Sequence, residues 1–194
     1  MMSSYKNFTD NELISAFQEG ELVAMENLII RYKDRIFTSI LFLVKDKYLA
    51  EDLFQEVFIK IIDTIRQGRY NEEGKFVSWA LRIAHNLCVD HFRKVKRTPN
   101  ILTTDGHDVM EWMQSKDDNP EQKVTRYQSH DRVRRMLDLL PEDQREVIVL
   151  RHYGNLSFKE IAGLTDTSIN TALGRMRYGL INLRKMMTEK QITL

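Results

Sequence analysis

The 194-residue sequence predicts an all-α fold of two small helical domains joined by an acidic linker. Apolar residues recur at steps of three and four over long segments, as in amphipathic helices, and no strand-type alternation competes with them. The composition changes at residues 98–121, which hold two of the three prolines and six acidic residues but one lysine. Such a segment is typical of a linker. We therefore place a first domain at residues 1–98, the linker at 99–130 and a second domain at 131–194.

The first domain contains three long apolar stripes. They run from Leu22 to Leu43, from Leu53 to Ile65 and from Phe76 to Leu87. Each stripe keeps helical spacing, so we expect three helices that pack as a bundle. Between the second and third stripes the stretch RQGRYNEEG has two glycines and polar residues, which predicts a loop.

The second domain is predicted to be smaller and also helical. Helical spacing returns between about Glu121 and Leu140, and Pro141 suits the first position of a new helix. Ser157 and Glu160 form a capping box that starts the short helix FKEIAGL. Ser168 can cap the next helix, for which we expect a core-facing stripe of Ile169, Ala172, Leu173, Met176 and Leu180. Two short helices about three residues apart form a helix-turn-helix, whose second helix is sized for a DNA major groove.

The composition is that of an ordinary globular protein, with 42% hydrophobic and 29% charged residues. No apolar run approaches the roughly 18 residues of a membrane span, and the first residues lack a basic stretch followed by an apolar one. We therefore expect no membrane anchor or signal peptide and a cytoplasmic location. Cys88 is the only cysteine and cannot form an internal disulfide, which fits a reducing compartment.

Charge is unevenly distributed although the net charge is only +1. The formal charges of the first domain, the linker and the second domain are +1, -3 and +3. Residues 168–187 contain Arg175, Arg177, Arg184 and Lys185 but no Asp or Glu. Because a carboxylate would repel a phosphate backbone, this pattern favours nucleic acid as a partner.

The second helix of the helix-turn-helix offers side chains for duplex DNA. Thr171 and Arg175 are four residues apart on the face expected to point outward, with Asn170 near the helix start. Arg177, Arg184 and Lys185 suit phosphates. The alternative is that the helix pair is a plain structural element.

A second basic cluster lies on the third helix of the first domain. Arg82, Asn86, Val89 and Arg93 lie opposite its apolar stripe, and Lys94, Lys96 and Arg97 continue the basic surface. Tyr70, Phe76 and Trp79 are close by in sequence. Basic residues with aromatics and an amide are what binding of single-stranded DNA requires. Against this, Phe76 and Trp79 lie on the apolar stripe, so at least one is expected in the core.

Four stretches in this order resemble a known family: AEDLFQEVFIKII, GKFVSWALRIAHNLCVDHFRK, LPEDQREVIVLRHYGNLSFKEIA and the helix-turn-helix. Together they are similar to bacterial RNA polymerase sigma factors of the sigma-70 family, in the extracytoplasmic-function (ECF) group. The resemblance covers about residues 10–187. It implies two helical domains, called regions 2 and 4, that direct promoter-specific initiation without catalytic activity.

The resemblance also implies roles for individual residues. Core polymerase would be bound through its beta-prime and beta subunits, with Asp52, Gln55 and Glu56 on the beta-prime coiled coil. The melted minus 10 promoter element would be held by Tyr70, Phe76, Trp79, Arg82, Asn86, Arg93, Lys94, Lys96 and Arg97. The duplex minus 35 element would be read by Ser168, Asn170, Thr171, Arg175 and Arg177. The simpler reading of Asp52, Gln55 and Glu56 is that they are solvated helix residues.

Further expectations follow from the same resemblance. An anti-sigma factor is implied as a partner that covers the docking surfaces. The linker's charge of -3 by itself leads to the hypothesis that this segment lies in a basic polymerase channel otherwise used by RNA. Asp166 replaces the glycine usual in the turn, and Asp tolerates a left-handed backbone. Gly174 and Thr165 also depart from the common pattern, which places the promoter sequence beyond inference.

Two other classes of function are weaker. A helix-turn-helix regulator without polymerase docking explains the second domain but leaves the surface from Tyr70 to Arg97 unused. An enzyme has little support, because the five histidines show no metal-ligand spacing and no glycine loop for phosphates is present. We therefore expect no catalytic residue, metal, cofactor or small-molecule substrate.

Overall fold

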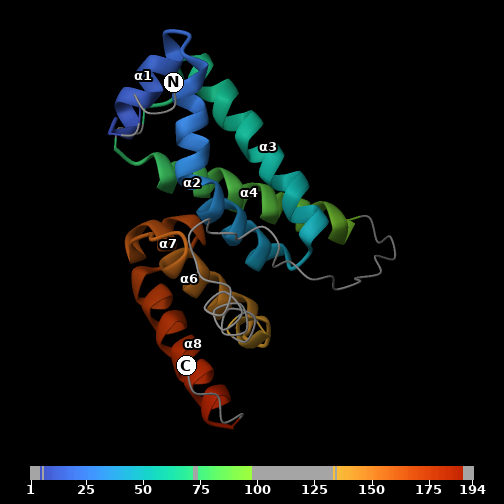
Figure 1. Cartoon of the computed structure of the whole chain (residues 1–194). Helices are drawn as coiled ribbons and strands as arrows, with labels where there is room; N and C mark the ends of the chain where they lie inside the picture. Colours follow the sequence, from blue (N-terminus) through green and yellow to red (C-terminus); the bar gives the residue numbers. More distant parts are fainter. Residues whose placement is uncertain (1–4, 6, 72–73, 98–132, 134, 190–194) are drawn as a thin grey trace, which may run out of the picture. The chain divides into compact units, whose positions relative to one another are not determined.

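The computed structural model describes residues 5, 7–71, 74–97, 133 and 135–189. Within these ranges the regular structure is α-helical and contains no strand, which confirms the all-α fold. The helices fall into two compact units, α1–α4 and α6–α8 (Figure 1). The acidic linker at 99–130 lies outside the described residues.

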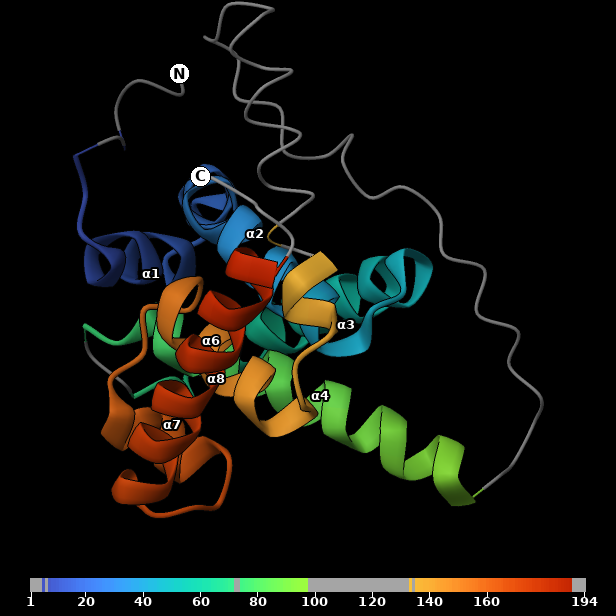
Figure 2. The same cartoon turned by 90° about the horizontal axis from the view of Figure 1, so that it is seen from below.

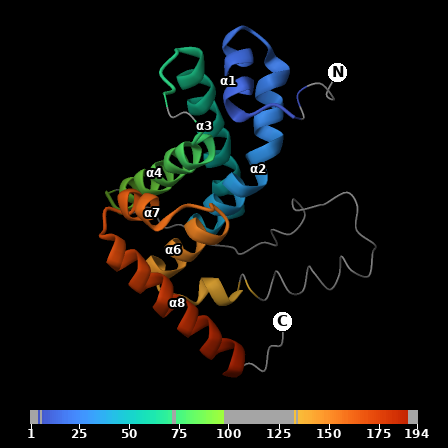
Figure 3. The same cartoon turned by 90° about the vertical axis from the view of Figure 1, so that its left-hand side faces the viewer.

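The first unit contains α1 (Asp10–Gln18), α2 (Leu22–Val44), α3 (Lys47–Arg66) and α4 (Phe76–Arg97). The helix α2 packs against both α1 and α4, and Figure 3 shows α1 lying alongside it. The predicted stripes supply much of the core, although Leu22, at the start of the first stripe, is 61% exposed, and α1 adds Leu13. The fully buried large side chains of the core include Leu13, Leu28, Ile36, Ile40, Ile61, Ile65, Phe76 and Leu81.

The second unit contains α6 (Glu142–His152), α7 (Phe158–Leu164) and α8 (Ile169–Glu189). The long helix α8 packs against both α6 and α7 (Figure 2). At Gly179 the backbone of α8 comes so close to α6 that a Cβ atom would lie 2.7 Å from Cδ1 of Ile148. Nearby, the Asn182 side chain donates to Oε1 of Gln144 at 2.8 Å. The absence of a side chain at Gly179 thus allows the two helices to approach.

Local details of the second unit agree with most sequence expectations. The Ser157 capping box forms with Glu160, and Asp166 has the left-handed backbone expected of it, with φ at 52°. Pro141 differs slightly. It precedes α6 as the N-cap, and its carbonyl accepts hydrogen bonds from the N–H groups of Gln144 and Arg145.

The core-facing stripe expected on α8 is largely wrong. Ala172 is fully buried, but Ile169, Leu173 and Leu180 are 46%, 44% and 45% exposed. The reason is that α8 meets its neighbours at Ala172 and Gly179, so the large apolar side chains lie to one side of the contact. Leu173 and Leu180 line an open groove together with Phe158, Met176, Arg177, Ile181 and Arg184.

Candidate nucleic-acid interface

The helix α4 has one buried and one exposed face. Its buried face packs into the first unit through Phe76, Trp79, Ala80, Ala84, Leu87 and Cys88. The polar residues expected opposite are all exposed: Arg82, Asn86, Arg93, Lys94, Lys96 and Arg97. Asp90 lies among them, with a carboxylate oxygen 3.5 Å from an Nη atom of Arg93, but both side chains are well exposed. The structure therefore presents a basic surface with one amide to solvent.

An aromatic cluster lies where the α3–α4 loop enters α4. The Tyr70 ring lies 4.7 Å from the Trp79 ring and 6.3 Å from the Phe76 ring, between centroids. Phe76 has no exposed surface and Trp79 is 9% exposed. Both rings therefore belong to the core, which is the alternative that the sequence left open. A base has no access to Phe76 in this structure. Of the three aromatic residues, only Tyr70 is partly exposed.

The polar face of α3 is accessible. Asp52, Gln55 and Glu56 are exposed, while Leu53 and Val57 on the other face are buried. Glu56 lies 3.3 Å from the Lys60 ammonium in a pair whose side chains are both about half exposed. Pairs of this kind contribute little to stability and separate easily when a partner binds. The three residues are thus placed where a protein could dock.

The helix-turn-helix consists of α7, a turn and α8. Asp166 lies in the turn, and the Thr167 N–H donates to the Ala162 carbonyl at 2.9 Å. The Thr165 hydroxyl donates to the Ile161 carbonyl at 2.9 Å and lies 3.0 Å from that of Thr167. These bonds satisfy polar groups at the end of α7 and hold the turn.

The first turn of α8 is exposed at Ser168, Asn170 and Thr171. Ser168 caps the helix as expected, because its Oγ accepts from the Thr171 N–H at 3.0 Å. The same Oγ lies 2.9 Å from Oγ1 of Thr171, so the two hydroxyls bind each other. A contact of either hydroxyl with a base edge would have to share or replace that bond.

The two arginines of the predicted reading helix differ. Arg177 is exposed, whereas Arg175 is only 26% exposed and its Nε lies 3.2 Å from a carboxylate oxygen of Asp143 in α6. Arg175 was expected on the outward face. It instead lies at the edge of the contact between α6 and α8, where an acidic partner is available.

The thiol of Cys88 lies on the buried face of α4. Burial raises the pKa of the Cys88 thiol to about 12, so the group is protonated at neutral pH. Among the described residues no cluster of three or more His, Cys, Asp or Glu side chains is arranged to hold a metal ion. In the same part of the chain, no helix combines the length and apolarity of a membrane span.

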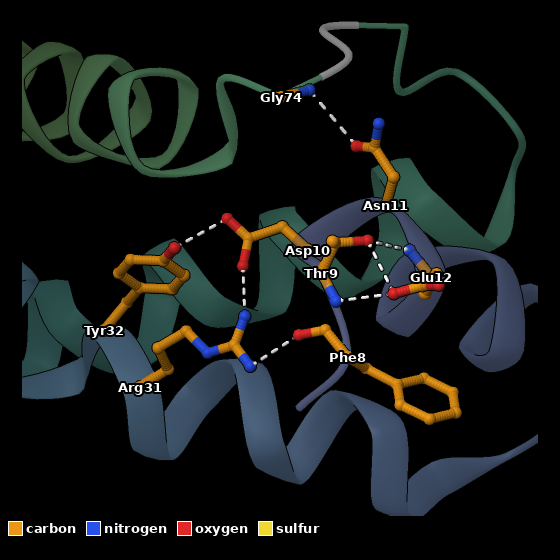
Figure 4. A network of polar contacts seen from close by, with 8 residues as sticks. All are labelled: Phe8, Thr9, Asp10, Asn11, Glu12, Arg31, Tyr32 and Gly74. Atoms are coloured by element: carbon orange, nitrogen blue, oxygen red, sulfur yellow. Dashed lines mark hydrogen bonds and ion pairs between the residues drawn. The ribbon is translucent and has the colours of Figure 1, made fainter. Parts of the chain in front are cut away.

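The sequence interpretation missed α1 and the contacts around it. A signal was present, since Thr9 and Glu12 have the spacing of a capping box, and both of its hydrogen bonds form. Figure 4 shows that Asp10, the next residue, is directed toward Arg31 and Tyr32 of α2. Asn11 extends from the same turn of α1 to Gly74 in the α3–α4 loop.

Two family models match the chain. The model of sigma-70 region 2 matches residues 28–98, and that of sigma-70 region 4 matches residues 130–173. The first match contains α3, the α3–α4 loop and α4. The second contains α6, α7 and the first turn of α8. Together they include most of the residues described above.

Curated relatives match along most of their length. The chain is 28% identical over 171 residues to the RNA polymerase sigma-H factor of Pseudomonas aeruginosa, covering 86% of this chain and 88% of that protein. It is 28% identical over 180 residues to the ECF RNA polymerase sigma factor SigW of Bacillus subtilis, covering 91% and 95%.

A solved structure has the same fold. It is the sigma factor RpoE in complex with the anti-sigma factor NepR from Bartonella quintana, with a TM-score of 0.62 at 18% identity over 84% of this chain and 96% of that one. Two region models in the expected order and full-length relatives agree on one assignment. The chain belongs to the sigma-70 family, as a sigma factor of the ECF group that directs transcription by RNA polymerase.

Proposed function

We propose that this sigma factor, bound to core polymerase, recognises its promoter at two separate places. The minus 10 element is held as a melted strand by α4 and the α3–α4 loop, and the minus 35 element is read as duplex by α8. The observation that carries the proposal is the exposed basic face of α4, which holds Asn86 among five basic side chains.

The α4 surface suits an unpaired strand. Arg93, Lys94, Lys96 and Arg97 extend over the last turns of α4 and can bind successive phosphates. Asn86 lies about two turns earlier, and an amide can donate to and accept from the exposed edge of an extruded base. Capturing such a base offsets a cost of a few kcal/mol for unstacking it. Stacking is assigned to Tyr70, which is partly exposed and packs on Trp79.

The α8 surface suits a duplex. Its first turn presents Ser168, Asn170 and Thr171, and the second helix of a helix-turn-helix contacts base edges with its N-terminal residues. Arg177 is exposed two turns further along and is suited to a phosphate. Arg175 contributes to recognition of the duplex while it is paired with Asp143.

Docking on polymerase is assigned to Asp52, Gln55 and Glu56, which would contact the coiled coil of the beta-prime subunit, with the beta subunit as a further partner. Region 2 then comprises residues 1–98 and region 4 residues 131–194. The linker at 99–130, with its charge of -3, would lie in a basic channel of polymerase. Neutralising its six carboxylates should then impair initiation.

An anti-sigma factor is proposed as a further partner. The similar RpoE structure contains one, and the exposed α3 and α8 surfaces of this chain are those that such a protein would cover. Co-purification from the host tests this. A chain found only free or bound to polymerase would remove the anti-sigma factor from the proposal.

The first test is binding of the purified chain to core RNA polymerase without DNA. We expect tight binding that Asp52→Ala combined with Gln55→Ala weakens by at least tenfold, about 1.4 kcal/mol. Glu26→Ala, an exposed acidic residue on α2, serves as the matched control and should bind like the wild type. Failure of the wild type to bind active core would instead favour a helix-turn-helix regulator acting on duplex DNA alone.

A further inference from the structure

Helix α1 is fixed to α2 by one carboxylate. The two oxygens of Asp10 accept from Nη1 of Arg31 and from the Tyr32 hydroxyl, each at 2.6 Å (Figure 4). Nη2 of Arg31 also donates to the Phe8 carbonyl at 2.8 Å. Hydrogen bonds to an ionised acceptor are stronger than neutral ones, and Asp10 is only 18% exposed. The N-terminus of α1 therefore has a defined position on α2.

The same helix contacts the chain at both ends of the α3–α4 loop. At the loop's start, the Gln18 amide donates to the Ile65 carbonyl at 3.2 Å, in the last turn of α3. The Arg66 guanidinium lies 5.6 Å from the centroid of the Phe17 ring. At the loop's end, Oδ1 of Asn11 accepts from the Gly74 N–H at 3.1 Å (Figure 4).

The spacing along α1 allows both contacts at once. Asn11 and Gln18 are seven residues apart, which places them on the same side of the helix, about 10 Å apart along its axis. They bind groups that lie 63 and 47 positions away in the sequence. A rigid two-turn segment of helix thus connects the start of the loop to its end.

Gly74 is a sensitive point at which to hold the loop. Its φ is 70°, which favours glycine, and α4 begins two residues later at Phe76. The Phe76 ring packs on Tyr32, the residue that binds Asp10, with 5.4 Å between centroids. The contact at Gly74 therefore fixes how the loop enters the first turn of α4. That turn carries Trp79, on which Tyr70 packs.

We propose that α1 is a strut that fixes the two ends of the α3–α4 loop relative to one another, at Ile65 and Gly74, with Asn11 and Gln18 as positioning residues for capture of the melted strand. This inference rests on the proposed function, because the loop is assigned to the minus 10 element. Neither residue touches DNA in the proposal. Each acts by holding one end of the loop, Gln18 at Ile65 and Asn11 at Gly74.

The strut itself can be tested without DNA, by amide hydrogen exchange of the full chain followed by NMR. In Asn11→Ala the Gly74 N–H loses its acceptor, so its exchange should accelerate at least tenfold. Asn11→Asp keeps an acceptor oxygen and should restore slow exchange. Ser15→Ala, at an exposed position of α1, is the control. Unchanged exchange of Gly74 in Asn11→Ala overturns the strut.

The functional part is tested with holoenzyme on a promoter selected in vitro by the wild-type protein. The probe is a labelled single strand covering the minus 10 region of that promoter. The double variant Asn11→Ala, Gln18→Ala should bind it 5- to 20-fold more weakly, while core binding and upstream duplex binding stay unchanged. Asn11→Asp should bind nearly as the wild type does.

The outcomes separate the two proposals. Wild-type strength of strand binding in the double variant, or an equal loss of duplex binding, overturns the positioning role. Failure of wild-type holoenzyme to bind the single strand counts against the proposed function instead. In that case the exchange of Gly74 still decides whether α1 holds the loop.

Discussion

Arg175 in α8 and Asp143 in α6 form an ion pair, with the guanidinium Nε 3.2 Å from a carboxylate oxygen. The side chains are 26% and 48% exposed, so the pair lies at the edge of the helix contact. Because a guanidinium is planar and carries five N–H donors, a partner on the Nε edge also restricts where the two Nη groups point. Asp143 thus limits the orientation of a residue assigned to DNA.

Replacing Arg175 by alanine should weaken binding of the upstream duplex by about 1 to 3 kcal/mol if Arg175 contacts a base. Asp143→Asn keeps the side-chain shape and removes the negative charge, so we expect binding of the upstream duplex to weaken by less than about 1 kcal/mol. Fluorescence anisotropy with a labelled duplex at fixed salt measures both. An unchanged affinity of Arg175→Ala would limit this arginine to a role in packing.

Asn86→Ala should reduce open-complex formation about tenfold, equivalent to about 1.4 kcal/mol, because the captured base loses its amide partner. Upstream duplex binding should be unaffected, since Asn86 belongs to the other unit. Permanganate reactivity of unpaired thymines reports opening, and a duplex without the minus 10 element reports upstream binding. Equal loss in the two assays contradicts the assignment of Asn86.

Replacing each of two glycines of α8 by alanine should change the stability of the fold in opposite directions. Gly174 has open space around its missing Cβ, so Gly174→Ala should stabilise the fold by about 0.5 to 1 kcal/mol through helix propensity. Gly179→Ala places a Cβ 2.7 Å from Cδ1 of the buried Ile148, and overpacking costs about 1 to 3 kcal/mol.

Denaturant unfolding measures the stability of both glycine variants. We expect the penalty in Gly179→Ala to shrink when Ile148→Val removes the clashing methyl group. A Gly179→Ala protein as stable as Gly174→Ala would show that α6 and α8 can separate at little cost.

Cys88 should be inert to alkylation in the folded protein. The residue is 2% exposed, and with a pKa of about 12 only about one molecule in ten thousand carries the thiolate at pH 8. Iodoacetamide labelling should therefore follow unfolding, with fast reaction in guanidinium and little in buffer. Rapid labelling of native protein would mean that the helix α4 opens locally.

The hydrogen bond from the Tyr32 hydroxyl to Asp10 of α1 should be sensitive to strong alkali. Burial, with a smaller contribution from the bond to Asp10, raises the pKa of Tyr32 to about 12 from 10.0. Since the folded-state pKa is the higher one, the stabilisation is complete below pH 10 and is lost as the pH rises toward 12. Tyrosinate absorbance compared between wild type and Tyr32→Phe should reveal one tyrosine that ionises late. If no late-ionising tyrosine were found, the burial of the Tyr32 side chain would be contradicted.

Features set within a few residues could be predicted from the sequence. The stripes from Leu22 to Ile65 gave α2 and α3, and the exposure of Asn86 followed from its place opposite the stripe of α4. The same local reasoning could have found α1 from Thr9 and Glu12. Helical periodicity is a pattern of nearby residues, and a capping bond joins groups within one turn. Neighbouring residues therefore suffice to specify where a helix forms and where it begins.

Burial within an element was harder to predict. Phe76 and Trp79 lie on the apolar stripe, which predicts at least one of them in the core, and the structure shows both there. Leu173 and Leu180 have helical spacing with Ala172, yet they remain largely exposed. Which side of an apolar stripe is covered depends on the neighbouring helix, and the stripe by itself does not specify that neighbour.

The sequence by itself determined that the fold is all-α, where most of the described helices run, and to which family the chain belongs. Tertiary structure decided the pairings that give those helices their detailed roles, Arg175 with Asp143 and Asn11 with Gly74. Each pairing joins segments far apart in the chain. It exists only because apolar burial brings two helices together, or a helix and a loop, and leaves polar groups at the contact that must satisfy one another.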